Sequence, residues 1–274
     1  MPCHWPQRTA GNAASKRVIR ARCRLPRGRA NRGFSLIELM IAMTISALLM
    51  LGLVQIASAA RSSFRLQEGL ASVQQGGRFA LESLADILQQ STFEPHPWLA
   101  TGITVGVTDQ SIDGLTASSD RLAVRGWSER NCFGNLNPVQ DAAGTAVFYL
   151  KESVIELNSS NNLAHTCRYG ATTGTLVLQI NRQGLVEDVE SFQVMYALDL
   201  DQDGQPDRWA TAAAWPPDAR LLGLQLGLLI RSPDTVVAPA ARIFNVLEHI
   251  FSAPGDGRLR RVFTYSQAFP GHAG

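Results

Sequence analysis

The distribution of apolar residues divides the N-terminal part of the chain into two segments. From Phe34 to Ala60 apolar side chains would cover all sides of a helix, and no proline occurs before about Gln90. Beyond Ala60 the apolar residues recur at helical spacing, with charged or amide residues between them. These recurring residues are Leu66, Leu70, Val73, Leu81, Leu84 and Leu88. The pattern predicts one helix over residues 34–90, about 85 Å long at about 1.5 Å per residue, whose outer half packs on a folded head.

Prolines and glycines mark the end and the weakest points of this helix. Pro95 and Pro97 terminate it, because proline fixes φ and has no N–H to donate. The outer half also carries Gly69, Gly76 and Gly77, each of which costs about 1 kcal/mol relative to alanine in a helix. We therefore expect the outer half to depend on packing against the rest of the chain.

After residue 97 the periodicity changes from helical to alternating, with many β-branched and aromatic residues. The predicted strands are Gly102–Val107, Arg121–Trp127, Ala146–Leu150, Ser153–Leu157, Thr175–Ile180, Val189–Leu198, Leu222–Ile230 and Val262–Gln267. Residues 240–250 are predicted to form a short helix. No series of longer helices alternates with the strands, so a parallel sheet is not expected. The predicted fold class is α+β, with the long N-terminal helix packed on an antiparallel β-sheet head.

The charge balance changes sharply along the chain. Residues 1–33 contain nine basic residues and no acidic ones, whereas the remainder contains 16 basic and 23 acidic residues, a net charge of −7. The basic leader fits retention on the cytoplasmic side of a membrane. The acidic remainder argues against generic binding to a phosphate backbone, so general nucleic-acid binding is not expected.

A carboxylate stands at the start of the apolar run, in the sequence Gly33-Phe34-Ser35-Leu36-Ile37-Glu38. An ionisable group in a membrane span costs about 2.5–3.5 kcal/mol, so it usually marks function. Ser35 and Glu38 also have capping-box spacing, which would start a helix. A secretory signal cleaved near Ala57-Ser58-Ala59 is one alternative, although the run exceeds the usual h-region of about 7–15 residues. A simple anchor is the other alternative, because the run reaches the roughly 20 residues that span a bilayer.

The Gly33-Phe34 junction, Glu38 and the uninterrupted apolar run together resemble the class III signal of type IV prepilins. The resemblance implies that a dedicated membrane peptidase cuts after Gly33 and methylates the new N-terminal residue, Phe34. It implies that Glu38 attracts the N-terminus of an adjacent subunit during assembly. The implied organisation is a cytoplasmic leader over residues 1–33, a transmembrane and stalk helix over 34–90, and a periplasmic β-rich head over 91–274.

The cysteines divide between the leader and the head. Cys3 and Cys23 lie in the leader, and Cys132 and Cys167 lie in the exported part, where disulfides persist. We predict one disulfide between Cys132 and Cys167. The alternative is a pair of separate buried thiols.

An acidic motif follows the predicted strand Val189–Leu198. Asp199, Asp201 and Asp203 alternate, Gly204 follows, and Asp207 completes the group. This spacing supplies hard oxygen ligands on one turn, and Gly204 permits a sharp bend, so the motif predicts one structural Ca²⁺. It departs from an EF-hand loop, because Ala210 stands where a bidentate Glu would be. The alternative is an acidic hairpin turn without metal.

Two segments of the head refine the resemblance. Glu187–Trp209, which contains the acidic motif, and Arg260-Arg261-Val262-Phe263-Thr264 are similar to segments of PilW-type minor pilins of type IV pilus systems. The resemblance implies a structural protein that helps to prime or assemble a pilus. Its implied partners are the prepilin peptidase, other minor pilins, the major pilin and the inner-membrane assembly platform. It would cross the inner membrane once, with its head in the periplasm, and later join the pilus at the cell surface.

Two further function classes remain open from the sequence. A pseudopilin of a type II secretion system shares the signal and stalk, and a pilus-tip adhesin or DNA-uptake module is a binding alternative. An enzyme is not expected, because no G-x-S-x-G elbow occurs and the histidines after the leader are scattered. These are His96, His165, His249 and His272. No organic cofactor is expected.

Overall fold

The computed structural model describes residues 33–95, 103, 105–116, 119–216, 218–236 and 240–269. The leader up to Arg32, Pro97 and the start of the first predicted strand at Gly102 lie outside these ranges. The chain divides into two compact units, Met1–Val54 and Gln55–Gly274.

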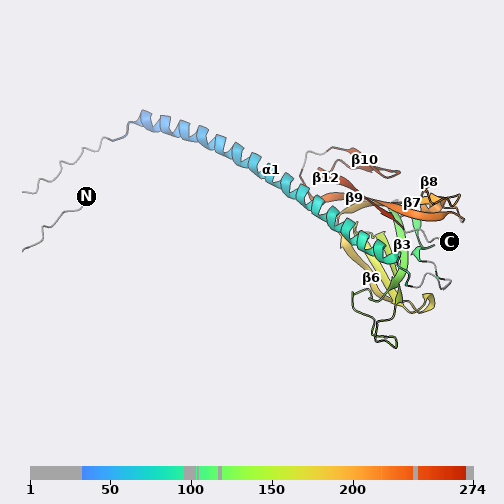
Figure 1. Cartoon of the computed structure of the whole chain (residues 1–274). Coiled ribbons are helices and arrows are strands. Elements are labelled where there is room, and N and C mark those ends of the chain that lie inside the picture. Colours follow the sequence, from blue (N-terminus) through green and yellow to red (C-terminus); the bar gives the residue numbers. More distant parts are fainter. Residues whose placement is uncertain are drawn as a thin grey trace, which may run out of the picture. The chain divides into compact units, whose positions relative to one another are not determined.

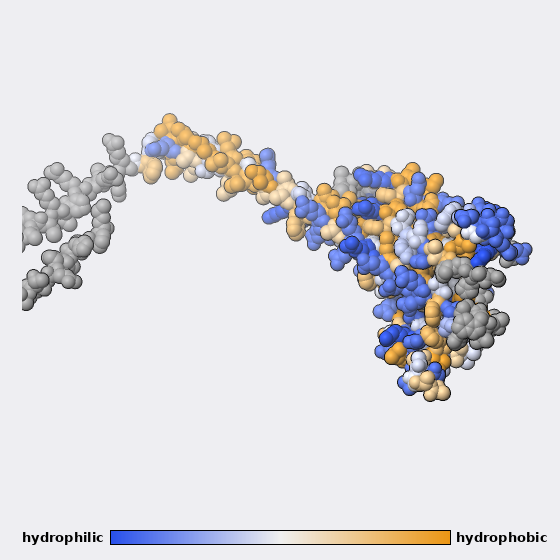
Figure 2. Space-filling model, viewed as in Figure 1, coloured by the Kyte–Doolittle hydropathy of each residue, from blue (hydrophilic) through white to orange (hydrophobic). Residues whose placement is uncertain are grey.

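The predicted N-terminal helix is present as α1 (Leu36–Ser91). Its residues up to Val54 belong to the first unit, where the large apolar side chains are exposed. Figure 2 shows this segment as a mainly hydrophobic surface. The helix ends four residues before Pro95, as the restricted backbone of proline requires.

From Gln55 onward α1 belongs to the head unit, and one side of it is buried. The buried residues follow intervals of three and four, which is the spacing of one helical face. They are Gly69, Val73, Gly77, Ala80, Leu84, Leu88 and Ser91. We call this set the buried seam. Two residues of the predicted apolar stripe, Leu66 and Leu70, lie outside it and are exposed.

Two glycines belong to the buried seam because other chain segments approach the helix closely there. A Cβ on Gly77 would lie 2.2 Å from the Phe263 ring, and one on Gly69 would lie 3.0 Å from Val236. Gly76 differs, because its nearest neighbour would be Val186 at 3.9 Å. Gly69 and Gly77 therefore have a role that the sequence did not indicate, because they allow the head to pack closely against the helix.

The head is built from β-strands and two short 3₁₀ helices among the described residues. The strands are β1 (Gly106–Val107), β2 (Ile112–Thr116), β3 (Ser119–Ser128), β4 (Tyr149–Leu157), β5 (Leu163–Gly170), β6 (Val177–Val186), β7 (Val189–Asp199), β8 (Arg208–Ala210), β9 (Arg220–Thr235), β10 (Arg242–Val246), β11 (His249–Ala253) and β12 (Arg258–Ala268). The 3₁₀ helices are η1 (Thr173–Thr175) and η2 (Ala212–Ala214).

The strands form two sheets and a hairpin (Figure 1). The first sheet has the order β1-β3-β4-β5-β6, with β2 also paired to β3, and the second has the order β12-β9-β7-β8. All strand pairs of the described residues are antiparallel. The hydrophobic core joins Leu84 and Leu88 of α1 to residues of both sheets, such as Leu122 and Phe192. The α+β, pilin-like fold predicted from the sequence is thus confirmed.

The predicted helix at residues 240–250 is wrong, because this segment forms the hairpin β10–β11. Ile243 and Ile250 point outward and are exposed, whereas Val246 is buried, which is the alternation of a strand. Val246 and Leu247 approach Gly227 of β9, where an added Cβ would lie 2.9 Å from each side chain. The turn contains no glycine or asparagine, since Leu247 itself adopts a φ of 54°, so the sequence carried no hairpin signal.

Two other strand predictions needed revision. The predicted strand Ser153–Leu157 lies within β4, whereas only the last two residues of the predicted strand Ala146–Leu150 belong to β4 and Ala146 makes only an isolated bridge to Gln140. The strand β5 was not predicted. Its sequence, LAHTCRYG, has polar side chains on both faces, so neither an apolar alternation nor an apolar run marks it.

Two loops of the first sheet contain three copies of one five-residue turn. In each, the Oδ1 atom of the first residue accepts hydrogen bonds from backbone N–H groups two and four residues ahead. The turns begin at Asn131, Asp141 and Asn158, and their fourth residues are Gly134 (φ 81°), Gly144 (φ 80°) and Asn161 (φ 57°). Glycine and asparagine tolerate this left-handed backbone best, so each turn is encoded within its own five residues.

Candidate functional site

The residues of the predicted cleavage site are sterically open. A Cβ built on Gly33 would have no neighbour within 4 Å, and Phe34 is 84% exposed. The backbone N–H of Leu39 donates to the carbonyl of Ser35 at 3.1 Å, so the helix begins directly after the junction. Glu38 lies in the first turn of α1, where a carboxylate interacts favourably with the positive end of the helix.

The segment that follows this junction is long and apolar enough to cross a membrane. No residue of its most apolar stretch is buried by protein. Leu48 and Leu49 illustrate this, since they are 69% and 65% exposed. Apolar surface in water is unfavourable by about 25 cal/mol per Å², so these side chains require lipid or other apolar helices around them.

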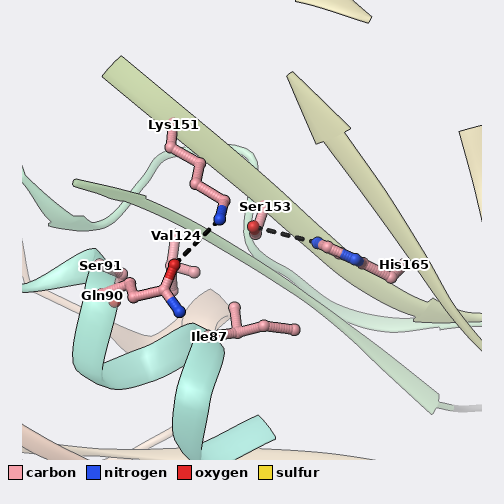
Figure 3. A pocket seen from close by; sticks show the side chains of 7 residues that line it. All are labelled: Ile87, Gln90, Ser91, Val124, Lys151, Ser153 and His165. Carbon is pink, nitrogen blue, oxygen red and sulfur yellow. Dashed lines mark hydrogen bonds between the residues drawn. The ribbon is translucent and has the colours of Figure 1, made fainter. Parts of the chain in front are cut away.

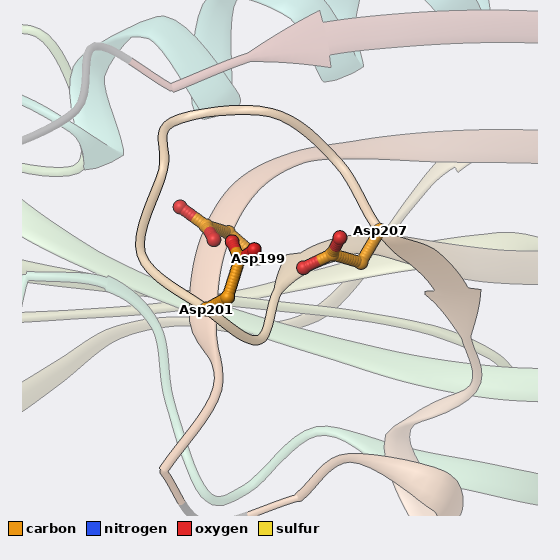
Figure 4. A group of neighbouring side chains, drawn as sticks. All are labelled: Asp199, Asp201 and Asp207. Carbon is orange, nitrogen blue, oxygen red and sulfur yellow. The ribbon is translucent and has the colours of Figure 1, made fainter.

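The acidic motif forms the loop between β7 and β8. Three of its carboxylates converge, with oxygen atoms within 4.8 Å of one another (Figure 4). They belong to Asp199, Asp201 and Asp207. The loop closes where the N–H of Asp207 donates to the carbonyl of Leu198 at 2.9 Å, and Gly204 has a φ of 86°. Three carboxylates in one concave loop are ligands that suit Ca²⁺.

Backbone hydrogen bonds fix these carboxylates in place. The buried Asp199 accepts from the N–H groups of Gln202 and Gly204 at 2.7 and 3.0 Å, and Asp207 accepts from Leu200 at 2.7 Å. Asp203, the fourth predicted ligand, does not belong to the converging group, and its Oδ1 accepts from the N–H of Gln205. The Ca²⁺ site stays a prediction, with Asp199, Asp201 and Asp207 as its main ligands.

The predicted disulfide between Cys132 and Cys167 is confirmed, and its Cα atoms lie 5.9 Å apart. It ties the loop between β3 and β4 to strand β5 across 35 residues of sequence. The N–H of Cys132 also donates to Gln179 of β6. The disulfide therefore holds a loop that has little regular structure of its own.

An ion-pair network anchors the C-terminal strand of the head. The Arg260 side chain is 3% exposed and pairs with Glu190 of β7 at 2.5 Å and with Asp256 at 2.7 Å. The hydrogen bonds from Arg260 hold the pKa of Asp256 well below its usual range. Phe263, three residues on, contacts α1 at Gly77. The segment from Arg260 to Phe263, read from the sequence only as a resemblance, thus fixes β12 to both β7 and α1.

Sequence reasoning missed a cavity of about 50 Å³ beneath the end of α1, which polar and apolar side chains line together (Figure 3). Lys151 of β4 points at Gln90 of α1 and donates to its Oε1 at 2.9 Å. No basic residue lies in the last turn of α1, so Lys151 supplies the positive charge that favours a helix C-terminus. Burial lowers the pKa of Lys151.

The same cavity contains a serine–histidine pair. Nε2 of His165 lies 3.0 Å from Oγ of Ser153. Burial, and then the charge of Lys151, lowers the pKa of His165 to about 4, so its ring is neutral near pH 7. Ligand pockets usually measure about 300–1,000 Å³, so a cavity of about 50 Å³ is too small for a substrate. We assign the pair a role in the core. In the sequence, only the alternation of residues along β4 and β5 could have placed the serine and the histidine on the same face of the sheet.

Comparison with known families gives two matches along the chain. The family described as Type IV Pilus-assembly protein W matches residues 154–267, and the Prokaryotic N-terminal methylation motif matches residues 28–54. The first range contains the acidic loop and Arg260, and the second contains Gly33, Phe34 and Glu38. No curated protein and no solved structure matches the chain significantly.

Proposed function

Since the chain belongs to the prepilin-like proteins of the PilW type, we propose that it is a minor pilin that takes part in assembling or priming a type IV pilus. The role is structural rather than enzymatic. The chain joins the pilus through the first half of α1, and the head carries the contacts that distinguish it from other subunits.

One observation supports this role above the others: a single helix is exposed and apolar in its first half and packed by its buried seam in its second. Such a helix is stable in lipid before assembly and among other apolar helices after it. Glu38 is the exception in the apolar half. Its carboxylate is unfavourable in lipid by about 2.5–3.5 kcal/mol, and a neighbouring ammonium would offset this cost.

We propose that the ammonium comes from another subunit. After cleavage behind Gly33, Phe34 carries a free and methylated amine, and Glu38 of one subunit would pair with that amine on the next. The prepilin peptidase would be the first partner. Other minor pilins, the major pilin and the inner-membrane platform would be the later ones.

The proposed topology is a single pass through the inner membrane with the head in the periplasm. Nine basic residues in the leader favour a cytoplasmic N-terminus. The Cys132–Cys167 disulfide is suited to an oxidising compartment.

Two variants test the proposal. Gly33→Val should leave the uncleaved precursor in the inner membrane, whereas Gly52→Ala, in the helix that follows and free of neighbours within 4 Å, should be processed normally. N-terminal sequencing of the wild-type protein should begin at Phe34. A sequence that begins at Ala60 would identify an ordinary secretory signal instead.

Glu38→Ala should insert and be cleaved but should fail to co-purify with the other minor pilins. Glu68→Ala is the matched control, because Glu68 is an exposed acid on the outer half of the same helix, and it should assemble normally. Normal piliation and normal co-purification of Glu38→Ala would refute the role. Co-purification with secretion-system components alone would favour the pseudopilin alternative.

A further inference from the structure

The first sheet has one face against α1 and one face turned away from it. On β3, Val124 lines the cavity beneath α1, so its neighbours Arg121 and Arg125 lie on the opposite face. On β4, Glu156 stands directly opposite Arg121, and Glu152 stands opposite Arg125. The face turned away from the helix is therefore charged, although it belongs to the interior strands of a sheet.

Four arginines on this face surround two glutamates, and we call this group the arginine lattice. Glu156 pairs with Arg121 at 2.6 Å and with Arg182 at 3.1 Å. Glu152 pairs with Arg125 at 2.6 Å and with Arg168 at 3.0 Å. The lattice thus has twice as many cations as anions and an excess of two positive charges.

The negative charges of the lattice are buried, and two of its four positive charges face solvent. The side chains of Glu152 and Glu156 are 2% and 6% exposed, whereas those of Arg168 and Arg182 are 37% and 53% exposed. A guanidinium carries more N–H groups than these single carboxylate contacts use. This positive surface lies on a chain whose net charge after Gly33 is −7.

The backbone is strained at the most exposed member of the lattice. Arg182 has a φ of 47°, which is uncommon for a residue other than glycine. It lies at a bulge in β6, where the pairing with β5 shifts between His165 and Cys167. Bulges re-aim side chains, and here the bulge brings the Arg182 guanidinium to Glu156. Stability alone does not require a residue with a left-handed backbone in the middle of a strand. Here that conformation serves to place a guanidinium.

The cationic residues of the lattice are of the type that is enriched at protein interfaces. Every basic residue after Gly33 is an arginine except Lys151, and arginine is enriched at protein interfaces where lysine is depleted. Leu178 stands opposite Arg168 in the sheet and is 46% exposed. An exposed leucine beside outward guanidiniums offers apolar contact together with bidentate binding of carboxylates.

We propose that the arginine lattice is a docking surface for a partner protein that presents a cluster of surface carboxylates. The surface lies on the head and is distinct from the contacts of the apolar half of α1, so it goes beyond the assembly role of that helix. A protein partner is favoured over nucleic acid, because the excess is only two charges and the acidic remainder of the chain repels a long polyanion. The partner's carboxylates would bind the outward N–H groups of Arg168 and Arg182.

The test measures binding of fluorescently labelled poly-L-glutamate to the processed protein in detergent micelles, by anisotropy at 50 mM salt. We expect binding that weakens steeply by 200 mM salt. The double variant Arg168→Gln/Arg182→Gln should bind at least tenfold more weakly. Arg61→Gln/Arg242→Gln is the matched control, since it removes two exposed positive charges elsewhere on the same unit, and it should bind like the wild type.

Three results would overturn the proposal. The first is that poly-L-glutamate does not bind the wild type at 50 mM salt. The second is that the lattice variant and the control weaken equally, which would show a general charge effect. The third is that duplex DNA binds the wild type more tightly than poly-L-glutamate through the same two arginines. The double variant is compared with the control by thermal melting. If it melts at a lower temperature, poly-L-glutamate binding is measured with Arg182→Gln alone, because Arg121 still pairs with Glu156 in that variant.

Discussion

The two halves of α1 differ in how their apolar residues are arranged and buried, although they form one helix. Up to Val54 the apolar residues cover every side and none of the large ones is buried, whereas from Gly69 to Ser91 one narrow seam is buried and the residues between its members are exposed or only partly buried. The comparison teaches that burial inside the protein leaves a helical periodicity of apolar residues in the sequence. Burial in lipid or in a helical bundle leaves only an apolar composition. Changes in the seam should therefore affect the head, and changes in the first half should affect assembly.

The largest contrast should come from one leucine in each half. Leu84→Ala should destabilise the head by about 2–5 kcal/mol, because it leaves a cavity in a fully buried site. Leu48→Ala should leave head stability unchanged, because its side chain is exposed and belongs to the other compact unit. Denaturant unfolding followed by tryptophan fluorescence measures both. Equal losses in the two variants would break the distinction between the halves.

The disulfide should stabilise only the head. Replacing Cys132 and Cys167 by serine should cost about 3–4 kcal/mol in the chain-entropy model for a loop of this length. Membrane insertion and cleavage behind Gly33 should be unaffected. Unfolding curves of the oxidised protein and the double variant give the difference, and alkylation of two thiols in the native wild type would contradict the prediction.

Metal binding in the acidic loop should also act on the head alone. A ligand at a hundredfold excess over its Kd stabilises the folded state by about 2.7 kcal/mol, so EDTA should lower the melting temperature of the wild type. Asp207→Asn should abolish this response. Asp203→Asn should keep much of it, because Asp203 lies outside the converging group. An unmoved melting curve with EDTA, and no heat of Ca²⁺ binding at millimolar levels, would make the loop an acidic turn.

Acidification should weaken the attachment of the seam's last turn. The pKa of His165 is lowered from 6.5 to about 4, so the unfolded chain takes up the proton first as pH falls, and stability is lost between about pH 6.5 and pH 4. At pH 5 this loss is about 2 kcal/mol.

Asp120 opposes the loss. Burial raises its pKa from 3.8 to about 6, which adds stability as pH falls from about 6 to 3.8 and contributes about 1.4 kcal/mol at pH 5. The stability of the wild type should therefore change little between pH 7.5 and pH 5. Because His165→Gln lacks the loss caused by His165, its stability relative to that of the wild type should rise by about 2 kcal/mol over the same range. Identical pH profiles of the two proteins would contradict this assignment.

The smallest expected effects on head stability come from alanine substitutions at two adjacent glycines. Gly76→Ala should stabilise the head by about 1 kcal/mol, because it raises helix propensity where the nearest atom lies 3.9 Å away. Gly77→Ala should destabilise it, because the new Cβ would meet the Phe263 ring at 2.2 Å. Thermal melting of the two variants should therefore shift in opposite directions. Shifts of the same sign would show that the seam does not fix the helix against β12.

The sequence predicted what is encoded locally or by composition. The helix, the antiparallel head, the Cys132–Cys167 pair and three of the acidic residues could all be found, because each depends on periodicity, on a count or on short spacing. The β10–β11 hairpin was missed because Leu247 adopts a left-handed φ without a turn-forming residue. The arginine lattice and the cavity at Lys151 and His165 were missed because their members come from different strands, and only the pairing register brings them together.

The repeated five-residue turns have a consequence for the order in which the head folds. The turn at Asn158 joins β4 directly to β5, so this hairpin closes over few residues and at a small entropic cost. Cys167 lies on β5 and Cys132 lies before β4, so hairpin formation shortens the effective distance between the two thiols. We expect β4–β5 to form early and the disulfide to follow it, with the docking of α1, whose contacts with β12 span long sequence separations, as the slow step.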